Sequence, residues 1–173
     1  RNFLLATKWQ PGFFEAWFNL GAAMSDQGNF EDAVLAYDHA LRLRENDRDV
    51  LRNLGLLHLA LAQFDDAEAY FLRVKALAPQ EARSYNDLGE TCRRAGRFEQ
   101  AKSHFTKAIE IEPDYHLAVY NLAITLEQLG EIRQAVETYE HYLNLRPEAP
   151  DAAETRALIA HLKTVRAESS THD

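Results

Sequence analysis

A leucine followed by glycine or alanine recurs along this chain at a constant step of 34 residues. The four pairs are Leu20-Gly21, Leu54-Gly55, Leu88-Gly89 and Leu122-Ala123. A constant period of a few tens of residues is typical of repeat proteins, in which similar units stack and each unit contacts only its neighbours. Such an array presents an extended surface rather than one enclosed pocket. The period therefore predicts a stacked array whose function lies on a surface.

Each 34-residue unit carries the pattern of two amphipathic helices. In the first unit, Trp17 lies three residues before the repeated leucine, and spacings of three and four residues place apolar side chains on one helical stripe. The second half of that unit contains Ala33 and, four residues later, Tyr37, which belong to a second stripe. A glycine separates the two stripes in three units, and Ala62 takes its place in the other. We expect one unit over each of the ranges 14–47, 48–81, 82–115 and 116–149.

Glycine and proline occupy fixed positions in this repeat. The repeated glycine lies in the middle of the first predicted helix, where glycine costs about 1 kcal/mol relative to alanine. We therefore expect a neighbouring helix to approach closely at that position. Proline cannot continue a helix. Four of the five prolines fall just after the second predicted helix: Pro11, Pro79, Pro113 and Pro147.

The pattern Trp17-x-x-Leu20-Gly21-x-x-Met24, followed by Ala33-x-x-x-Tyr37, resembles the tetratricopeptide repeat, and the next three units repeat it. This resemblance covers four complete units. It implies an all-α fold, an α-solenoid in which antiparallel helix pairs form a right-handed superhelix. The departures from the family pattern, which we expect to soften single turns only, are Glu45 for proline, Ala62 for glycine and Ala123 for glycine.

The two ends of the chain differ from the repeated units. Residues 1–13 match the second helix of a further, truncated upstream unit, and we expect apolar surface to be exposed there. Two outcomes remain open for that surface: a frayed end, or self-association through the exposed helix. Residues 150–167 predict a capping helix with one apolar stripe and a polar outer face, as repeat arrays require. Residues 168–173 predict a disordered tail.

Composition and charge exclude several classes of function. The formal net charge is −8, which argues against nucleic-acid binding because phosphate recognition needs a basic face. No apolar run approaches the roughly 20 residues that a membrane-spanning helix needs, so we expect no membrane insertion. The single cysteine, Cys92, excludes an intrachain disulfide and fits a reducing compartment. We therefore predict a cytoplasmic protein.

No group of residues in the sequence indicates catalysis. No phosphate-binding glycine loop and no nucleophile elbow is present. No two of the seven histidines lie four residues apart on one helix with a carboxylate partner. We therefore predict no enzyme activity, no catalytic residues, no metal and no cofactor.

One polar position of the repeat is not explained by packing. In tetratricopeptide arrays the first helices line the concave side, and the residue directly before the repeated leucine is here Asn19, Asn53, Asp87 or Asn121. An amide both donates and accepts, so it can pair with the backbone of an extended peptide whatever the peptide sequence. The run resembles the asparagine ladder of arrays attached to O-linked N-acetylglucosamine transferases, interrupted by Asp87. The alternative is that asparagine, a poor helix former, is merely tolerated on a half-exposed face.

Further candidate groove residues surround this ladder. They are Phe18, Arg52, Arg83, Asn86, Glu90, Arg94 and Tyr120. Arg52 and Arg83 lie on consecutive first helices, where they either converge on an acidic group or remain solvated charges. Phe18 and Tyr120 are either apolar anchors for a partner or ordinary packing residues.

The sequence thus predicts a protein–protein interaction scaffold. It would bind an extended peptide or a helix of a protein partner in the groove between its first helices, without a cofactor. One alternative is the substrate-recruiting arm of a larger enzyme such as a glycosyltransferase. The other is a self-assembling structural array.

Overall fold

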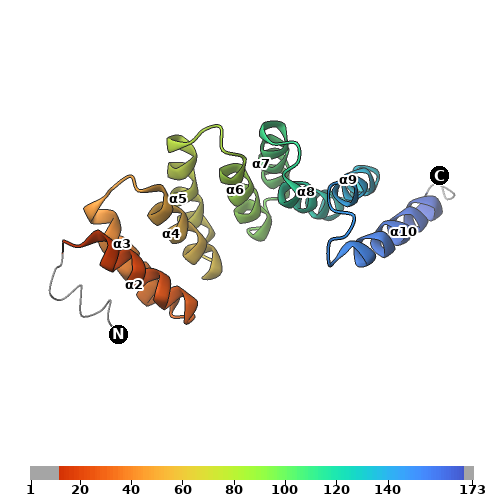
Figure 1. Cartoon of the computed structure of the whole chain (residues 1–173). Helices are drawn as coiled ribbons and strands as arrows, with labels where there is room; N and C mark the ends of the chain where they lie inside the picture. The colour runs from red at the N-terminus through yellow and green to blue at the C-terminus, as the bar shows by residue number, and fades with distance from the viewer. Residues whose placement is uncertain (1–11, 170–173) are drawn as a thin grey trace. The chain divides into compact units, whose positions relative to one another are not determined.

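The computed structural model describes residues 12–169, which form helices and contain no strand (Figure 1). The helices are α2 (Phe14–Asp26), α3 (Phe30–Leu43), α4 (Arg48–Ala60), α5 (Phe64–Leu77), α6 (Ala82–Arg94), α7 (Phe98–Ile111), α8 (His116–Gln128), α9 (Ile132–Leu145) and α10 (Ala152–Ser169). The predicted all-α fold is confirmed within this range. The chain divides into two compact units: Arg1–Pro79, which contains α2 to α5, and Gln80–Asp173, which contains α6 to α10.

Two predictions concern residues outside the described range. The truncated upstream helix expected over 1–13 lies almost wholly outside it, so self-association through that helix stays a prediction. The last four residues of the expected tail also lie outside it. The expected capping helix is longer than predicted, because α10 continues to Ser169 rather than ending at residue 167. Neither glycine nor proline interrupts this stretch, so nothing in the sequence ends the helix earlier.

The turn inside each helix pair has one geometry throughout. Its central residue has a positive φ angle: 77° at Gly28, 57° at Ala62, 74° at Gly96 and 76° at Gly130. In the second pair, the Ala62 N–H donates to the Leu59 carbonyl and the Gln63 N–H donates to the His58 carbonyl, at 3.1 and 2.8 Å. These two bonds form the Schellman motif that satisfies the last carbonyls of a helix. Ala62 therefore keeps the glycine geometry of the other turns and does not soften its own.

The mid-helix glycines lie against aromatic rings, as the sequence predicted. A Cβ atom at Gly21 would lie 2.9 Å from the Tyr37 ring, and a Cβ atom at Gly55 would lie 2.7 Å from the Phe71 ring. Both distances are shorter than side chains tolerate without movement. Each first helix therefore needs a very small residue where the aromatic residue of its own second helix crosses it.

Each unit has its own packed interior. In the first unit α2, α3, α4 and α5 pack in chain order, around buried residues that include Tyr37 and Leu54. In the second unit α6 to α10 also pack in order, and α6 additionally contacts α8. Ile159 and Leu162 of α10 are buried with residues of α8 and α9, so the last helix covers the end of this unit. In the second unit the two first helices, α6 and α8, are thus in contact, which positions the candidate site there.

Candidate functional site

Each unit has a candidate site, made of polar side chains on the first helices of its repeats and here called the first-helix face of that unit. In the first unit this face belongs to α2 and α4, and in the second unit to α6 and α8. The ladder position is occupied by Asn19, Asn53, Asp87 and Asn121 on these four helices. Asn19 is exposed on α2. The other three positions differ in what they contact.

Asn53 is held by a hydrogen bond to the preceding repeat. Its Nδ2 donates to the Tyr37 hydroxyl at 3.1 Å, which joins α4 to α3. Burial, followed by the Asp26 charge, raises the pKa of Tyr37 to about 12, so the phenol keeps its proton at neutral pH. This bond depends on a tyrosine at that repeat position. Phe71 and Phe105 are the equivalents in the next two repeats and have no hydroxyl to offer.

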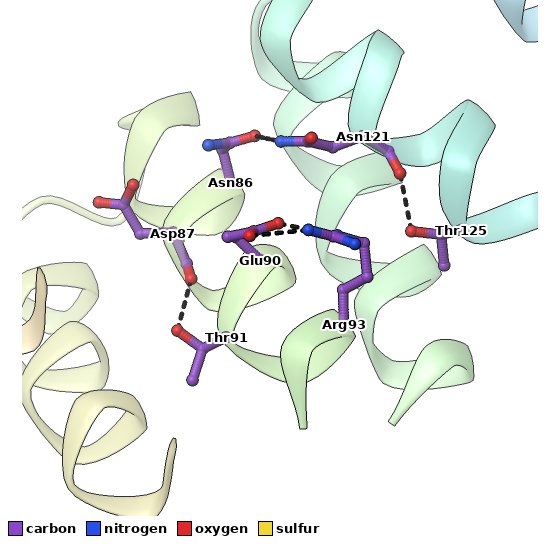
Figure 2. Close-up of polar contacts among 7 residues, drawn as sticks. All are labelled: Asn86, Asp87, Glu90, Thr91, Arg93, Asn121 and Thr125. Carbon is purple, nitrogen blue, oxygen red and sulfur yellow. Dashed lines mark hydrogen bonds and ion pairs between the residues drawn. The ribbon is translucent and has the colours of Figure 1, made fainter. Parts of the chain in front are cut away.

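Asn121 finds a different partner in the second unit. Its Nδ2 donates to Asn86 Oδ1 at 3.1 Å, so two amides on α8 and α6 are joined head to tail (Figure 2). Asn86 is buried, with 8% of its surface exposed, and Asn121 is half-buried. Asp87 is also buried, and Figure 2 shows its carboxylate pointing away from the amide pair. The ladder is therefore interrupted at Asp87 in both chemistry and direction.

Threonines four residues after the ladder position bond back to its backbone. The Thr91 hydroxyl donates to the Asp87 carbonyl at 2.8 Å, and the Thr125 hydroxyl donates to the Asn121 carbonyl at 2.7 Å (Figure 2). Such bonds fix the threonine side chain and bend a helix slightly. These bonds go to the backbone carbonyls of the ladder residues and not to their side chains.

Charged residues on the face of α6 fall into two groups. Glu90 and Arg93 form a two-point ion pair, with Nε to Oε2 and Nη2 to Oε1 both at 2.8 Å (Figure 2). Arg83 and Arg94 are exposed. The candidate Glu90 is thus engaged by a residue that the sequence interpretation did not name. The spacing of three residues between Glu90 and Arg93 is the sequence signal from which this ion pair could have been predicted.

Arg52 lies on α4 in the first unit and is buried, with 8% of its surface exposed. This burial contradicts the alternative in which Arg52 and Arg83 are a pair of solvated charges, since only Arg83 is exposed. Convergence of the two on an acidic group stays a prediction.

The two candidate aromatic anchors are part of aromatic clusters. Phe18 meets the Tyr37 ring edge-to-face at 5.6 Å between centroids. Tyr120 lies 4.9 Å from the Tyr142 ring and 5.8 Å from the Tyr139 ring. Burial and then the charges of nearby carboxylates raise the pKa of Tyr120. Both residues therefore pack against neighbours while keeping a half-exposed edge.

Metal-ligand clusters and membrane-spanning helices are absent from residues 12–169. No group of three or more histidine, cysteine, aspartate or glutamate side chains in this range is placed to hold a metal ion. Cys92 is buried, as expected of a core side chain. No helix in the same range is both long and apolar enough to cross a bilayer.

Comparison with known proteins assigns the family. Family models described as tetratricopeptide repeat match residues 14–47, 47–114 and 93–163. The chain is a tetratricopeptide repeat protein. Its fold is accordingly the α-solenoid that the repeat pattern predicts.

Solved structures share the α-solenoid fold of this chain. This tetratricopeptide repeat protein is similar to MamA (41-end) from Desulfovibrio magneticus RS-1, with 22% identity, a TM-score of 0.77, and coverage of 83% of this chain and 81% of that one. YrrB, a protein of this family with an unusual peptide-binding site, has 16% identity and a TM-score of 0.70, over 95% and 84% of the two chains. Pseudomonas aeruginosa pilF has 22% identity and a TM-score of 0.76, over 87% and 69%. At these identities the likeness concerns the fold alone.

One curated relative is an enzyme, and it matches over a short stretch. Protein O-mannosyl-transferase Tmtc3 of Drosophila melanogaster is 34% identical over 62 residues, which are 36% of this chain and 7% of the enzyme. The aligned stretch is a small part of that protein. It does not show catalysis in this tetratricopeptide repeat protein.

Proposed function

We propose that this protein is an interaction scaffold that binds an extended segment of a partner protein along its first-helix face. The observation that carries the proposal is that Asn53 and Asn121 are each anchored by a hydrogen bond to another side chain of their own unit. An anchored amide has already lost rotamer freedom, so less entropy is lost when a ligand binds to it.

The anchored amides retain the capacity that a peptide backbone needs. A carboxamide offers two N–H donors and an oxygen with two lone pairs. The bond from Asn121 to Asn86 uses one donor of the first and one lone pair of the second. The pair therefore still has N–H groups for a backbone carbonyl and oxygen lone pairs for a backbone N–H. This chemistry needs neither a cofactor nor a catalytic residue, and we propose that the chain is not an enzyme.

The test uses the backbone of the ligand. Nonamer peptides are first selected on the 173-residue chain from a displayed random library. Each backbone N–H of a selected peptide is then replaced in turn by an ester oxygen. Since one neutral hydrogen bond contributes about 0.5–1.5 kcal/mol, esters at the recognised positions should weaken binding by about 2- to 10-fold.

The protein variants identify which amides are responsible. A peptide that binds the first unit should bind Asn53→Ala more weakly and lose the effect of one ester. A peptide that binds the second unit should do the same with Asn121→Ala. Asn144→Ala, at an exposed position of the second helix α9, is the matched control and should behave as wild type. If every ester binds as tightly as the parent peptide, backbone recognition is wrong.

A second candidate function rests on the match to the O-mannosyl-transferase. In it the repeats are the substrate-recruiting arm of a larger glycosyltransferase. The discriminating measurement is the mass of the native polypeptide in source cells, by blotting with an antibody against this chain. A band well above 19.8 kDa is required by this candidate, and a native protein of 19.8 kDa would rule it out.

A further inference from the structure

A small pocket opens on the first unit where α4 meets the turn between α2 and α3. Its volume is about 120 Å³. The apolar part of its lining includes Phe30, Leu56 and Leu57, and the polar part consists of Ser25, Tyr37 and Asn53. Leu56 is 40% exposed and Tyr37 is 2% exposed, so the pocket extends from the surface to a buried hydroxyl. A cavity of about 150 Å³ holds a benzene molecule, so this pocket holds a group of a few heavy atoms.

The inner end of the pocket has hydrogen-bonding capacity that its own residues leave unused. Among the described residues, the Tyr37 hydroxyl bonds only to Asn53, from which it accepts at 3.1 Å. Its proton therefore remains to be donated, and Asn53 Oδ1 remains to accept. If the amide is turned round, the pair still presents one donor and one acceptor side by side. An uncharged group that both accepts and donates a hydrogen bond fits this pair.

The charge near the pocket restricts the occupant further. The Asp26 carboxylate acts on the Tyr37 hydroxyl strongly enough to contribute to its raised pKa. An acidic side chain entering the pocket would meet the same repulsion. A lysine or arginine would have to place its charge among apolar walls, which is costly. The occupant is therefore neutral.

The equivalent position does not provide this chemistry in the other repeats. Phe71 and Phe105 replace Tyr37 in the second and third repeats. Tyr139 replaces it in the fourth, where its hydroxyl donates to Glu127 Oε2 at 3.1 Å. A tyrosine hydroxyl that accepts from an asparagine and keeps its proton for a ligand thus occurs, among these four positions, only at Tyr37.

We propose that this pocket takes a threonine side chain of the partner segment, an inference that rests on the scaffold function proposed above. The threonine methyl group packs against Leu56 and Leu57. Its hydroxyl accepts from Tyr37 and donates to Asn53 Oδ1. Valine has the same shape without the hydroxyl, so it would leave both polar groups buried and unsatisfied. The free-energy cost of leaving these groups unsatisfied predicts a binding preference for threonine over valine of about 5- to 100-fold.

The test compares threonine with valine in a peptide selected from the displayed library. Dissociation constants are measured by fluorescence anisotropy for the selected peptide and for its threonine-to-valine derivative. Wild type should prefer the threonine peptide by about 5-fold or more. Tyr37→Phe should reduce this preference several-fold, because it removes one of the two hydrogen bonds to the threonine hydroxyl. Phenylalanine already occupies this position in two repeats, so the fold should tolerate it. Tyr139→Phe is the matched control and should keep the wild-type preference.

The outcomes separate this inference from the function on which it rests. If peptides are selected but threonine and valine bind alike, or if Tyr37→Phe keeps the full wild-type preference, the threonine pocket is wrong and the scaffold function stands. If the library yields no binding peptide, both are wrong. A threonine preference that falls in Tyr37→Phe and is unchanged in Tyr139→Phe supports the assignment of Tyr37 and Asn53 as the residues that select the ligand.

Discussion

The turn at Ala62 allows a quantitative test of how the repeat stores strain. Ala62 has φ 57°, in the left-handed region where the equivalent turns have glycine. An L-residue in that region costs roughly 1–2 kcal/mol. Glycine avoids this cost but loses about 0.4–1 kcal/mol because its unfolded chain is more flexible. Ala62→Gly should therefore raise the free energy of unfolding by about 0.5–1 kcal/mol.

The reverse substitution provides a matched control. A Cβ atom built at Gly96 has no other atom within 4 Å, so alanine there would be strained in conformation without any clash. Gly96→Ala, at φ 74°, should lower the free energy of unfolding by about the amount that Ala62→Gly raises it. Both substitutions alter the same turn motif, in different repeats. The decisive comparison is therefore between the signs of their two effects on the free energy of unfolding.

The measurement is urea unfolding followed by circular dichroism, with amide hydrogen exchange of α4 and α5 to localise the effect. Repeat arrays unfold in parts, so exchange reports the affected hairpin directly. For a chain of this length the change corresponds to a shift in melting temperature of about 1–4 °C. If Ala62→Gly is neutral or destabilising while Gly96→Ala destabilises, the strain assigned to Ala62 is absent and the reasoning is wrong.

Three further predictions follow from the packing and the pKa values. Gly55→Ala should lower the free energy of unfolding in urea by about 1–3 kcal/mol, because the new Cβ would lie 2.7 Å from an aromatic ring. A Cβ atom at Gly12 would have no other atom within 4 Å, so Gly12→Ala is the control and should be neutral. Tyr142→Phe removes the hydroxyl that donates to Asp151 at 2.8 Å, so amide exchange in α10 should become several-fold faster; unchanged exchange would contradict this. Burial is the largest cause that raises the pKa values of Tyr37 and Tyr142 to about 12. The contribution of the two protonated hydroxyls to the free energy of unfolding is therefore complete below pH 10 and is lost as the pH rises toward 12. A urea midpoint that stays constant between pH 10 and pH 12 would contradict this prediction.

The repeat period predicted the parts of the fold that depend on local sequence. The close approach at Gly21 and Gly55 could be predicted because a mid-helix glycine has a cost that only packing explains. The geometry of the Ala62 turn was not predicted, since alanine does not show in sequence that the surrounding helices impose a left-handed conformation. The continuation of α10 to Ser169 was missed for the opposite reason, because no residue marks the end of that helix.

The candidate site could be predicted by position but not by contact. The period placed Asn53 and Asn121 at equivalent positions, yet their hydrogen bonds go to unrelated partners. Those partners depend on which side chain the neighbouring helix offers, a hydroxyl in one case and the Asn86 amide in the other. A comparison of Tyr37 with Phe71 at the same repeat position is the signal that would have indicated the first bond.

The central claim is that anchored first-helix amides bind the backbone of a partner segment. It is tested most directly by nuclear magnetic resonance of the side-chain amide groups during titration with a peptide selected from the library. The account predicts that the signal of Asn53, for a peptide bound to the first unit, or of Asn121, for one bound to the second, shifts with the dissociation constant of the peptide. The signal of the exposed Asn144 does not shift. Saturating peptide that leaves the Asn53 and Asn121 signals in place would contradict it.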